Sequence, residues 1–308
     1  MDKGFLDNKT AVLSYRGGII SAGKDGSIGI AEGVSFDICE RESFALIGET
    51  GSGKTMTALS VMDLLPSGVK QEGEEVLFMG KTIPKGKAMQ ALLGNEIVYI
   101  PQNGAESLDP LRTVRKQMYD GLKKLGTKKE MLSSEASSKL SLSGFEDPDE
   151  ILDKYPFQLS GGMCQRVTIA IAACSNAKLI IADEPSNGLD DDFAEDFIAL
   201  VRRIFPKAAV LMITHDISIA SKCGSIAVLC GGKMMEKGRA SEVLKDPCSP
   251  YTGSLIAALP ENGMKATPVL REGKSLCPFY SRCPEASEVC ISSFPWQGDE
   301  ERGRRCVL

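Results

Sequence analysis

Four short motifs along this chain carry residue types suited to chemistry on phosphate groups. The first, residues 48–55, reads Gly-Glu-Thr-Gly-Ser-Gly-Lys-Thr and fits the phosphate-loop pattern G-x-x-x-x-G-K-[ST]. Its glycines let successive backbone N–H groups turn toward phosphate oxygens. The others read Leu-Ser-Gly-Gly-Met at 159–163, Leu-Ile-Ile-Ala-Asp-Glu-Pro at 179–185 and Thr-His-Asp at 214–216. Together the four motifs predict a site that binds and hydrolyses ATP.

Each part of the phosphate loop has an expected task. Lys54 can reach the β- and γ-phosphates as a point charge, and the Thr55 hydroxyl is placed to ligate Mg2+. A strand over 43–48 before the loop and a helix over 54–65 after it supply the context that a phosphate loop requires. The residues expected to cradle the phosphates are Gly48, Gly51, Ser52 and Gly53.

Two carboxylates and one histidine follow apolar strands. Asp183 closes the run 179–182, where ligands of open α/β sheets bind, and we expect it to hold Mg2+ through water. Glu184 points the other way if the strand geometry persists, so it can face an attacking water. His215, the only histidine in the chain, follows the strand 209–213. Adjacent strands would then bring Glu184 and His215 to one sheet edge, above the phosphate loop.

The Leu-Ser-Gly-Gly-Met motif predicts an anion site at a helix start. Ser160 stands at an N-cap position before a helix over 163–173, whose first N–H groups and positive dipole end favour a negative ligand. Gly161 and Gly162 allow close backbone approach. Such a terminus can bind phosphate.

The elements that position these motifs alternate along the chain. Further strands are expected at 33–38, 96–100 and 226–230, and a further helix at 193–204. This alternation predicts a mostly parallel sheet with helices on both faces. Between the halves of that sheet, residues 111–142 are helical and polar, and Asp147 begins another helix.

The order and spacing of these motifs, and above all Leu-Ser-Gly-Gly-Met, resemble the nucleotide-binding subunit of an ATP-binding-cassette (ABC) transporter over nearly the whole chain. The resemblance implies an α/β fold of the P-loop NTPase class with an inserted helical subdomain at about 105–175. It also implies an ATP-binding domain over 1–235 and a short cysteine-rich C-terminal extension over 236–308.

The resemblance also implies roles for single residues. Glu184 would be the general base, and His215 would contact the γ-phosphate and position the attacking water. Gln102, after the strand 96–100, would contact the metal and the water. Tyr15 would stack on adenine. Asp190 matches a loop that communicates across a dimer interface, whereas Ser186, Asn187 and Gly188 depart from the commoner form and get no role.

In such dimers the signature residues Ser160, Gly161 and Gly162 close over the ATP held by the opposite subunit. One cassette in this chain therefore predicts a second ATPase subunit as partner. The resemblance adds two transmembrane permease subunits and an extracytoplasmic solute-binding protein, with this chain peripheral on the cytoplasmic side of the membrane. We expect a cytosolic chain, because no apolar run approaches the roughly 18 residues of a membrane span and no signal-peptide core is visible.

Four of the ten cysteines crowd into the last part of the chain. They are Cys277, Cys283, Cys290 and Cys306. Their sequence context, with Asp-Pro-Cys-Ser-Pro-Tyr at 246–251, resembles the C-terminal extension of oligopeptide, dipeptide and nickel importer ATPases. That resemblance favours a [4Fe–4S] cluster as a structural clip, while zinc and free thiols stay open. Disulfides suit a cytosolic chain poorly.

The sequence thus predicts an ATPase subunit that powers import of oligopeptides, dipeptides or related solutes. Import of nickel or a metal chelate by the same machine is one alternative, and a soluble ABC ATPase acting on ribosomes or DNA is another. The net charge of −5 argues against nucleic acid as a partner. A small-molecule kinase would give no reason for Leu-Ser-Gly-Gly-Met. The transported solute is beyond the sequence, because this subunit need never touch it.

Overall fold

The structure is a computed structural model, and it describes residues 11–23, 26–185, 191–299 and 301–307, without the side chains of 191–196. The chain divides into two compact units, which are described separately. Unit 1 comprises residues 1–12, 39–41 and 84–212, and unit 2 comprises residues 13–38, 42–83 and 213–308.

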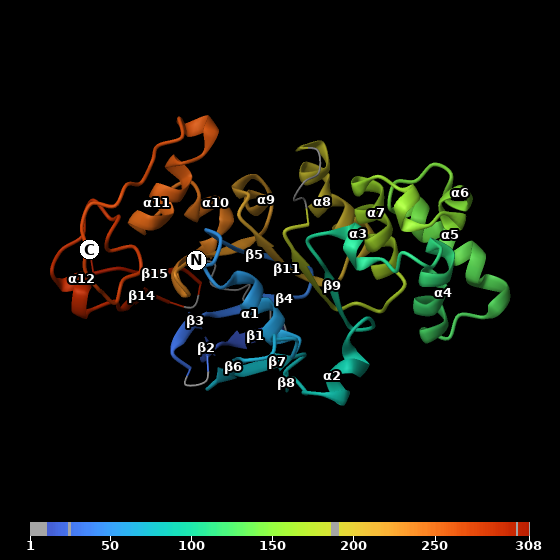
Figure 1. Ribbon diagram of the computed structural model, residues 1–308, viewed down its shortest axis with the longest axis horizontal. Helices are drawn as coiled ribbons and strands as arrows, with labels where there is room; N and C mark the ends of the chain where they lie inside the picture. Colours follow the sequence, from blue (N-terminus) through green and yellow to red (C-terminus); the bar gives the residue numbers. More distant parts are fainter. Residues whose placement is uncertain (1–10, 24–25, 186–190, 300, 308) are drawn as a thin grey trace, which may run out of the picture. The chain divides into compact units, whose positions relative to one another are not determined.

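Unit 1 combines a few buried strands with most of the longer helices (Figure 1). Strands β9 and β10 pair in parallel, with Leu179 opposite Ile97, and β11 lies beyond β10. The strands are β9 (Ile97–Ile100), β10 (Leu179–Asp183) and β11 (Ala209–Thr214), of which the last two residues belong to unit 2. The helices are α2 (Lys87–Leu92), α3 (Gly104–Ser107), α4 (Val114–Lys124), α5 (Leu132–Leu142), α6 (Pro148–Asp153), α7 (Gly161–Ala172) and α8 (Asp191–Ile204).

Helices α4 to α7 lie close together (Figure 1). They surround an apolar core of their own. Along α4 the buried residues recur every fourth position at Val114, Met118 and Leu122, which is the spacing of one helix face. The opposite face is polar and carries Lys123 and Lys124. Asp147 caps α6 by accepting a hydrogen bond from the Glu150 N–H, as the sequence predicts.

Unit 2 contains the N-terminal strands, the helix after the phosphate loop, and the C-terminal part of the chain. Its larger sheet runs in the order β6-β2-β3-β13-β12-β5, and a smaller one runs β4-β1-β7-β8. The strands are β1 (Ala11–Arg16), β2 (Ile19–Ala22), β3 (Ile28–Glu32), β4 (Ser35–Cys39), β5 (Ser43–Gly48), β6 (Val69–Glu72), β7 (Glu75–Phe78), β8 (Lys81–Thr82), β12 (Ser225–Cys230) and β13 (Lys233–Arg239). Helix α1 spans Lys54–Val61, and α9 spans Ile217–Ser221.

After β13 the chain forms short elements. These are α10 (Ala240–Val243), α11 (Pro250–Ala257), α12 (Val289–Ser292), β14 (Trp296–Gly298) and β15 (Gly303–Arg305). Residues 277–306 are called the cysteine tail below. Its strand β15 pairs antiparallel with β13, with Arg304 opposite Glu236, so the tail extends the larger sheet of unit 2.

Most sequence-based element predictions agree with the structure to within a few residues. Helix α1 ends at Val61 rather than at residue 65, and α7 begins at Gly161 rather than at residue 163, because Ser160 already caps it. In the described part of the chain, no helix combines the length and apolarity that a membrane span needs.

Candidate functional site

The phosphate loop lies between a buried strand and a helix in unit 2. All six residues of β5 are buried, and α1 begins at Lys54. Gly53 precedes the helix in the left-handed region with φ 91°, and a Cβ there would come within 2.6 Å of the Ile30 carbonyl oxygen. Glycine is therefore required by both the backbone and the space at this position. The strand, loop and helix expected of a phosphate-binding site are all present.

Two polar side chains of the loop are buried. The Lys54 ammonium is 7% exposed and donates to the carbonyl oxygens of Gly48 (2.7 Å) and Glu49 (3.0 Å). The Ser52 hydroxyl is also buried and has no hydrogen-bond partner among the described residues. A buried hydroxyl without a partner costs free energy unless a ligand binds it. This site therefore fits an anion with several acceptor oxygens, as a phosphate has.

The other predicted residues of unit 2 lie close to element ends. Gly51 has φ 81°, and Thr55 is half-buried in the first turn of α1. His215 is exposed between β11 and α9, where the Asp216 side chain caps α9 by accepting from the Ser218 N–H. His215 thus follows its strand directly, as predicted.

The structure does not support adenine stacking by Tyr15. Its side chain is 1% exposed, its hydroxyl hydrogen-bonds the Ser60 hydroxyl at 2.9 Å, and its ring stacks on Phe36 with centroids 5.2 Å apart. Burial raises the pKa of Tyr15 to about 12. The ring is packed in the protein core, so no open face remains for a base.

In unit 1, Asp183 is the buried end of β10. It is 4% exposed and accepts a hydrogen bond from the Tyr99 hydroxyl at 3.1 Å. Burial and the Asp183 carboxylate both raise the pKa of Tyr99 above its usual range, so Tyr99 stays a donor. This contact orients one carboxylate oxygen of Asp183. Tyr99 is therefore a positioning residue, which the sequence did not indicate.

The backbone turns at Glu184, where the extended geometry assumed from the sequence does not persist. Strand β10 ends at Asp183, and Glu184 has φ 45°, in the left-handed region. A non-glycine residue there is uncommon and concentrates at functional sites. A turn, and not continued strand alternation, therefore sets the backbone direction after Asp183.

Two further predicted segments lie in unit 1. Gln102 is exposed just after β9. Ser160 is the N-cap of α7 and accepts from the Met163 N–H at 3.3 Å, which confirms the predicted cap. Gly161, which is exposed, and Gly162, which is half-buried, begin the first turn of α7. Asp190 and residues 186–188 lie outside the described residues.

The structure therefore presents the predicted ATP site in two parts. Unit 2 holds the phosphate loop and His215, whereas unit 1 holds Gln102, Ser160, Asp183 and Glu184. That Glu184 and His215 meet at one edge remains a prediction.

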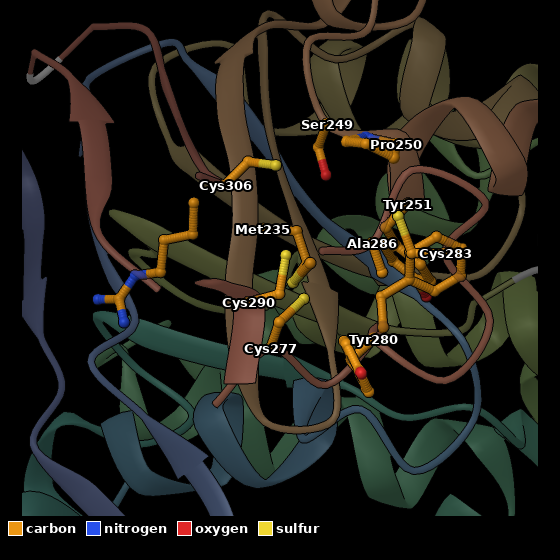
Figure 2. Close-up of a pocket in the computed structure, with 12 residues that line it drawn as sticks. Met235, Ser249, Pro250, Tyr251, Cys277, Tyr280, Cys283, Ala286, Cys290 and Cys306 are labelled. Carbon is orange, nitrogen blue, oxygen red and sulfur yellow. The ribbon is translucent and has the colours of Figure 1, made fainter. Parts of the chain in front are cut away.

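The four cysteines of the tail line a single pocket of unit 2 (Figure 2). Cys283 and Cys290 are each 6% exposed, and Met235, Ser249 and Tyr251 complete part of the wall. Burial, with a smaller contribution from the neighbouring thiols Cys290, Cys283 and Cys306, raises the pKa of Cys277 to about 11. A thiol whose pKa is raised in this way needs a nearby positive charge to become a thiolate.

Two observations bear on whether this pocket fits a metal. Among the residues the structure describes, no three metal-ligating side chains are grouped as a single ion needs. The Ser249 hydroxyl and the Arg305 Nε are buried in the same pocket without partners there, so donors are available to anionic sulfur. The chemistry of the pocket suits a sulfur-rich group, but a one-ion zinc site finds no support in this arrangement.

Sequence reasoning missed two residues that contact the phosphate loop. Arg282 forms an ion pair with Glu49 at 2.7 Å, and the Tyr251 hydroxyl accepts from the Glu49 N–H at 3.2 Å. One feature of the sequence could have indicated such a contact: Glu49 is an acidic residue inside an anion-binding loop, where a nearby cation is favourable. The cation itself lies 233 residues away in sequence, so no local pattern could identify it.

Comparisons with known proteins agree with this geometry. Residues 31–187 match the family described as ABC transporter, and residues 235–290 match the oligopeptide/dipeptide transporter C-terminal region. The chain is 36% identical over 290 residues to the dipeptide transport ATP-binding protein DppD of Bacillus subtilis, covering 88% of this chain and 86% of that protein. The chain belongs to the ATP-binding subunits of oligopeptide and dipeptide ABC transporters.

Two further likenesses are to a curated relative and to a solved structure. The oligopeptide transport ATP-binding protein OppD of Bacillus subtilis is 36% identical over 76% of this chain and 68% of its own. The solved structure of cbiO1 from Clostridium perfringens, part of the ABC transporter complex cbiONQ, aligns with a TM-score of 0.67 at 23% identity, covering 77% of this chain and 92% of that one. At that identity the structural likeness shows the fold alone, an ABC ATPase of the P-loop class.

Proposed function

We propose that this chain is the ATP-hydrolysing subunit that powers import of oligopeptides or dipeptides through membrane permease partners. The observation that carries the proposal is the phosphate loop, with its buried Lys54 and unpartnered Ser52, in a chain whose residues 235–290 match the peptide-transporter C-terminal region. The similarity to DppD and OppD, which are named as dipeptide and oligopeptide transport ATP-binding proteins, supports peptides as the transported solute.

Phosphate binding, metal binding and proton transfer are assigned to different residues of the site. Lys54 and the loop N–H groups hold the β- and γ-phosphates, and Ser52 donates to one of their oxygens. Thr55, Gln102 and Asp183 would hold Mg2+, which would neutralise charge on the phosphates. Tyr99 orients Asp183 by the hydrogen bond at 3.1 Å. Glu184 accepts a proton from the attacking water, which His215 positions.

The signature residues act on a second ATPase subunit. Ser160 caps α7, and the remaining N–H groups of the first helical turn are suited to binding an anion at this helix start. We assign Ser160, Gly161 and Gly162 to the ATP bound by the partner, with Asp190 at the same interface. Two permease subunits and an extracytoplasmic binding protein complete the assembly, with this chain on the cytoplasmic side of the membrane.

The domain plan follows from the same assignment. Residues 1–235 form the ATP-binding domain, and α4 to α7 supply the inserted helical subdomain at about 105–175. Residues 236–308 form the extension. Cys277, Cys283, Cys290 and Cys306, which line its pocket, would hold a [4Fe–4S] cluster as thiolates. The cluster would clip the tail to the sheet.

The direct test is transport by the reconstituted assembly. Vesicles containing this chain and its permease partners, with the cognate binding protein outside and ATP inside, should accumulate labelled di- to pentapeptides. Peptide addition should also raise ATP hydrolysis. Accumulation of nickel instead of peptides would reassign the solute, and ATP hydrolysis without any uptake would contradict the transport function.

A further inference from the structure

The phosphate loop carries a negative charge of its own at Glu49. ATP brings several negative charges to the same loop, and like charges a few ångströms apart repel, more strongly near a protein surface than in bulk water. The loop attracts anions through Lys54 and its backbone N–H groups, so an uncompensated carboxylate there would weaken nucleotide binding.

Arg282 of the cysteine tail compensates that carboxylate. Its Nη1 donates to Glu49 Oε1 at 2.7 Å and its Nη2 donates to Oε2 at 2.8 Å. Such a two-bond pair fixes the orientation of both groups as well as neutralising their charges. The guanidinium also lies over the ring of Phe279, 5.3 Å from its centroid, and Phe279 is 2% exposed. The ring of the buried Phe279 therefore supports the guanidinium of Arg282.

A second contact holds the backbone of the same residue. The Tyr251 hydroxyl accepts a hydrogen bond from the Glu49 N–H at 3.2 Å, and the Tyr251 ring packs edge-on against Phe279 at 5.2 Å. Tyr251 and Phe279 also line the cysteine pocket, in which Figure 2 labels Tyr251. The side chain and the N–H of Glu49 are therefore both held by residues from the C-terminal part of the chain.

We propose that Arg282 is a positioning residue for ATP binding, which neutralises Glu49 and fixes the start of the phosphate loop. The inference rests on the proposed role of the loop in holding ATP. It assigns the cysteine tail a part in the nucleotide site besides its own folding.

Steady-state ATP hydrolysis by the complete transporter tests the proposal. Arg282→Ala should raise the KM for ATP about three- to tenfold while kcat changes less, because the exposed carboxylate repels the nucleotide before the chemical step. The increase should shrink at high salt, which screens partly exposed charges. Arg282→Lys should recover part of the loss, since it restores the charge without the second hydrogen bond.

A double substitution separates charge compensation from tail folding. Glu49→Ala alone should lower the KM, and Glu49→Ala with Arg282→Ala should remove most of the increase, because no carboxylate is left to repel ATP. Arg302→Ala is the matched control, since this tail arginine pairs with Glu242 at 3.5 Å. It should leave the KM for ATP unchanged.

Two results would overturn the proposal. An unchanged KM in Arg282→Ala would remove Arg282 from the nucleotide site, and a raised KM that persists in the double variant would mean that Arg282 acts through tail folding alone. Lys54→Met keeps the failures distinguishable. Normal ATP binding by that variant would contradict the proposed phosphate site itself, whatever Arg282 does.

Discussion

The phosphate loop and the cysteine tail lie in the same unit, but different forces shape them. The loop is framed by six buried strand residues and by glycines at positive φ, so its backbone is set before any ligand arrives. The tail has only short elements, such as the four residues of α12, and arginines bind it to the rest of unit 2. Arg271, for example, donates to the Cys283 carbonyl oxygen at 2.8 Å.

This contrast implies different consequences of substitution. A change at a functional side chain of the loop should alter chemistry while the fold persists, because apolar burial elsewhere stabilises it. A change at a tail cysteine should alter stability first, since a short segment with little core would depend on the proposed cluster. Arg282 is the proposed exception, as a tail residue that acts on the loop.

The largest effect on ATP binding should come from Lys54→Met, which keeps the apolar stem and removes the charge. ATP binding and turnover should each fall on the order of 10²-fold, because a buried ammonium to phosphate contact is lost. The melting temperature without nucleotide should change little. Equilibrium binding of a labelled ATP analogue checks this, and binding within a factor of two of the wild type would contradict the site.

Ser160→Arg should act across the dimer. This chain's own ATP binding should stay intact, while hydrolysis at the partner's site falls on the order of tenfold or more, because bulk and charge occupy the helix start that closes over that nucleotide. Trapping of labelled nucleotide in each subunit separates the two sites. Damage confined to this chain's own site would contradict the proposed arrangement.

Cys306→Ser should mainly affect the tail. Protein purified without oxygen should lose its iron and brown colour, and its melting temperature should fall on the order of 5 °C, while ATP turnover stays within a few-fold of the wild type. Cys248→Ser is the control, because that exposed thiol does not line the pocket. Wild-type protein with zinc and no iron, or with neither metal, would contradict the cluster.

The smallest effect concerns pH in the metal-free chain. Burial raises the pKa of Cys277 from its reference value of 9.0 to about 11, so the folded chain holds this proton more tightly than the unfolded chain. The resulting stability is complete below about pH 9 and is lost as pH rises toward about 11. Urea midpoints measured at about pH 8 and 10.5 should differ more in the wild type than in Cys277→Ser. Equal differences would show that Cys277 does not contribute.

Local patterns predicted the parts of this molecule that depend on neighbours in sequence. The phosphate loop, the cap at Ser160 and the helix start at Asp147 each need only a few adjacent residues. Contacts between segments that are distant in sequence could not be predicted from these patterns. Tyr15 lies in the core, where Ser60, 45 residues away, hydrogen-bonds its hydroxyl. A strand pattern does not say which face packs inward.

The same limit applies within the candidate site. A run of apolar residues before Asp183 indicated a buried strand, but not that Glu184 would leave it with φ 45°. Local propensity does not favour a left-handed glutamate, so this geometry comes from surrounding structure. The pairing of Arg282 with Glu49 likewise needed the folded chain, because it joins the two regions contrasted above.

The most direct test of the account is ATP turnover by the assembled transporter carrying Glu184→Gln. The substitution keeps the shape of the side chain and removes the proton acceptor, so turnover should fall by on the order of 10²-fold or more while ATP binding is retained. Turnover close to that of the wild type would contradict Glu184 as the base and, with it, the chemistry proposed for this site.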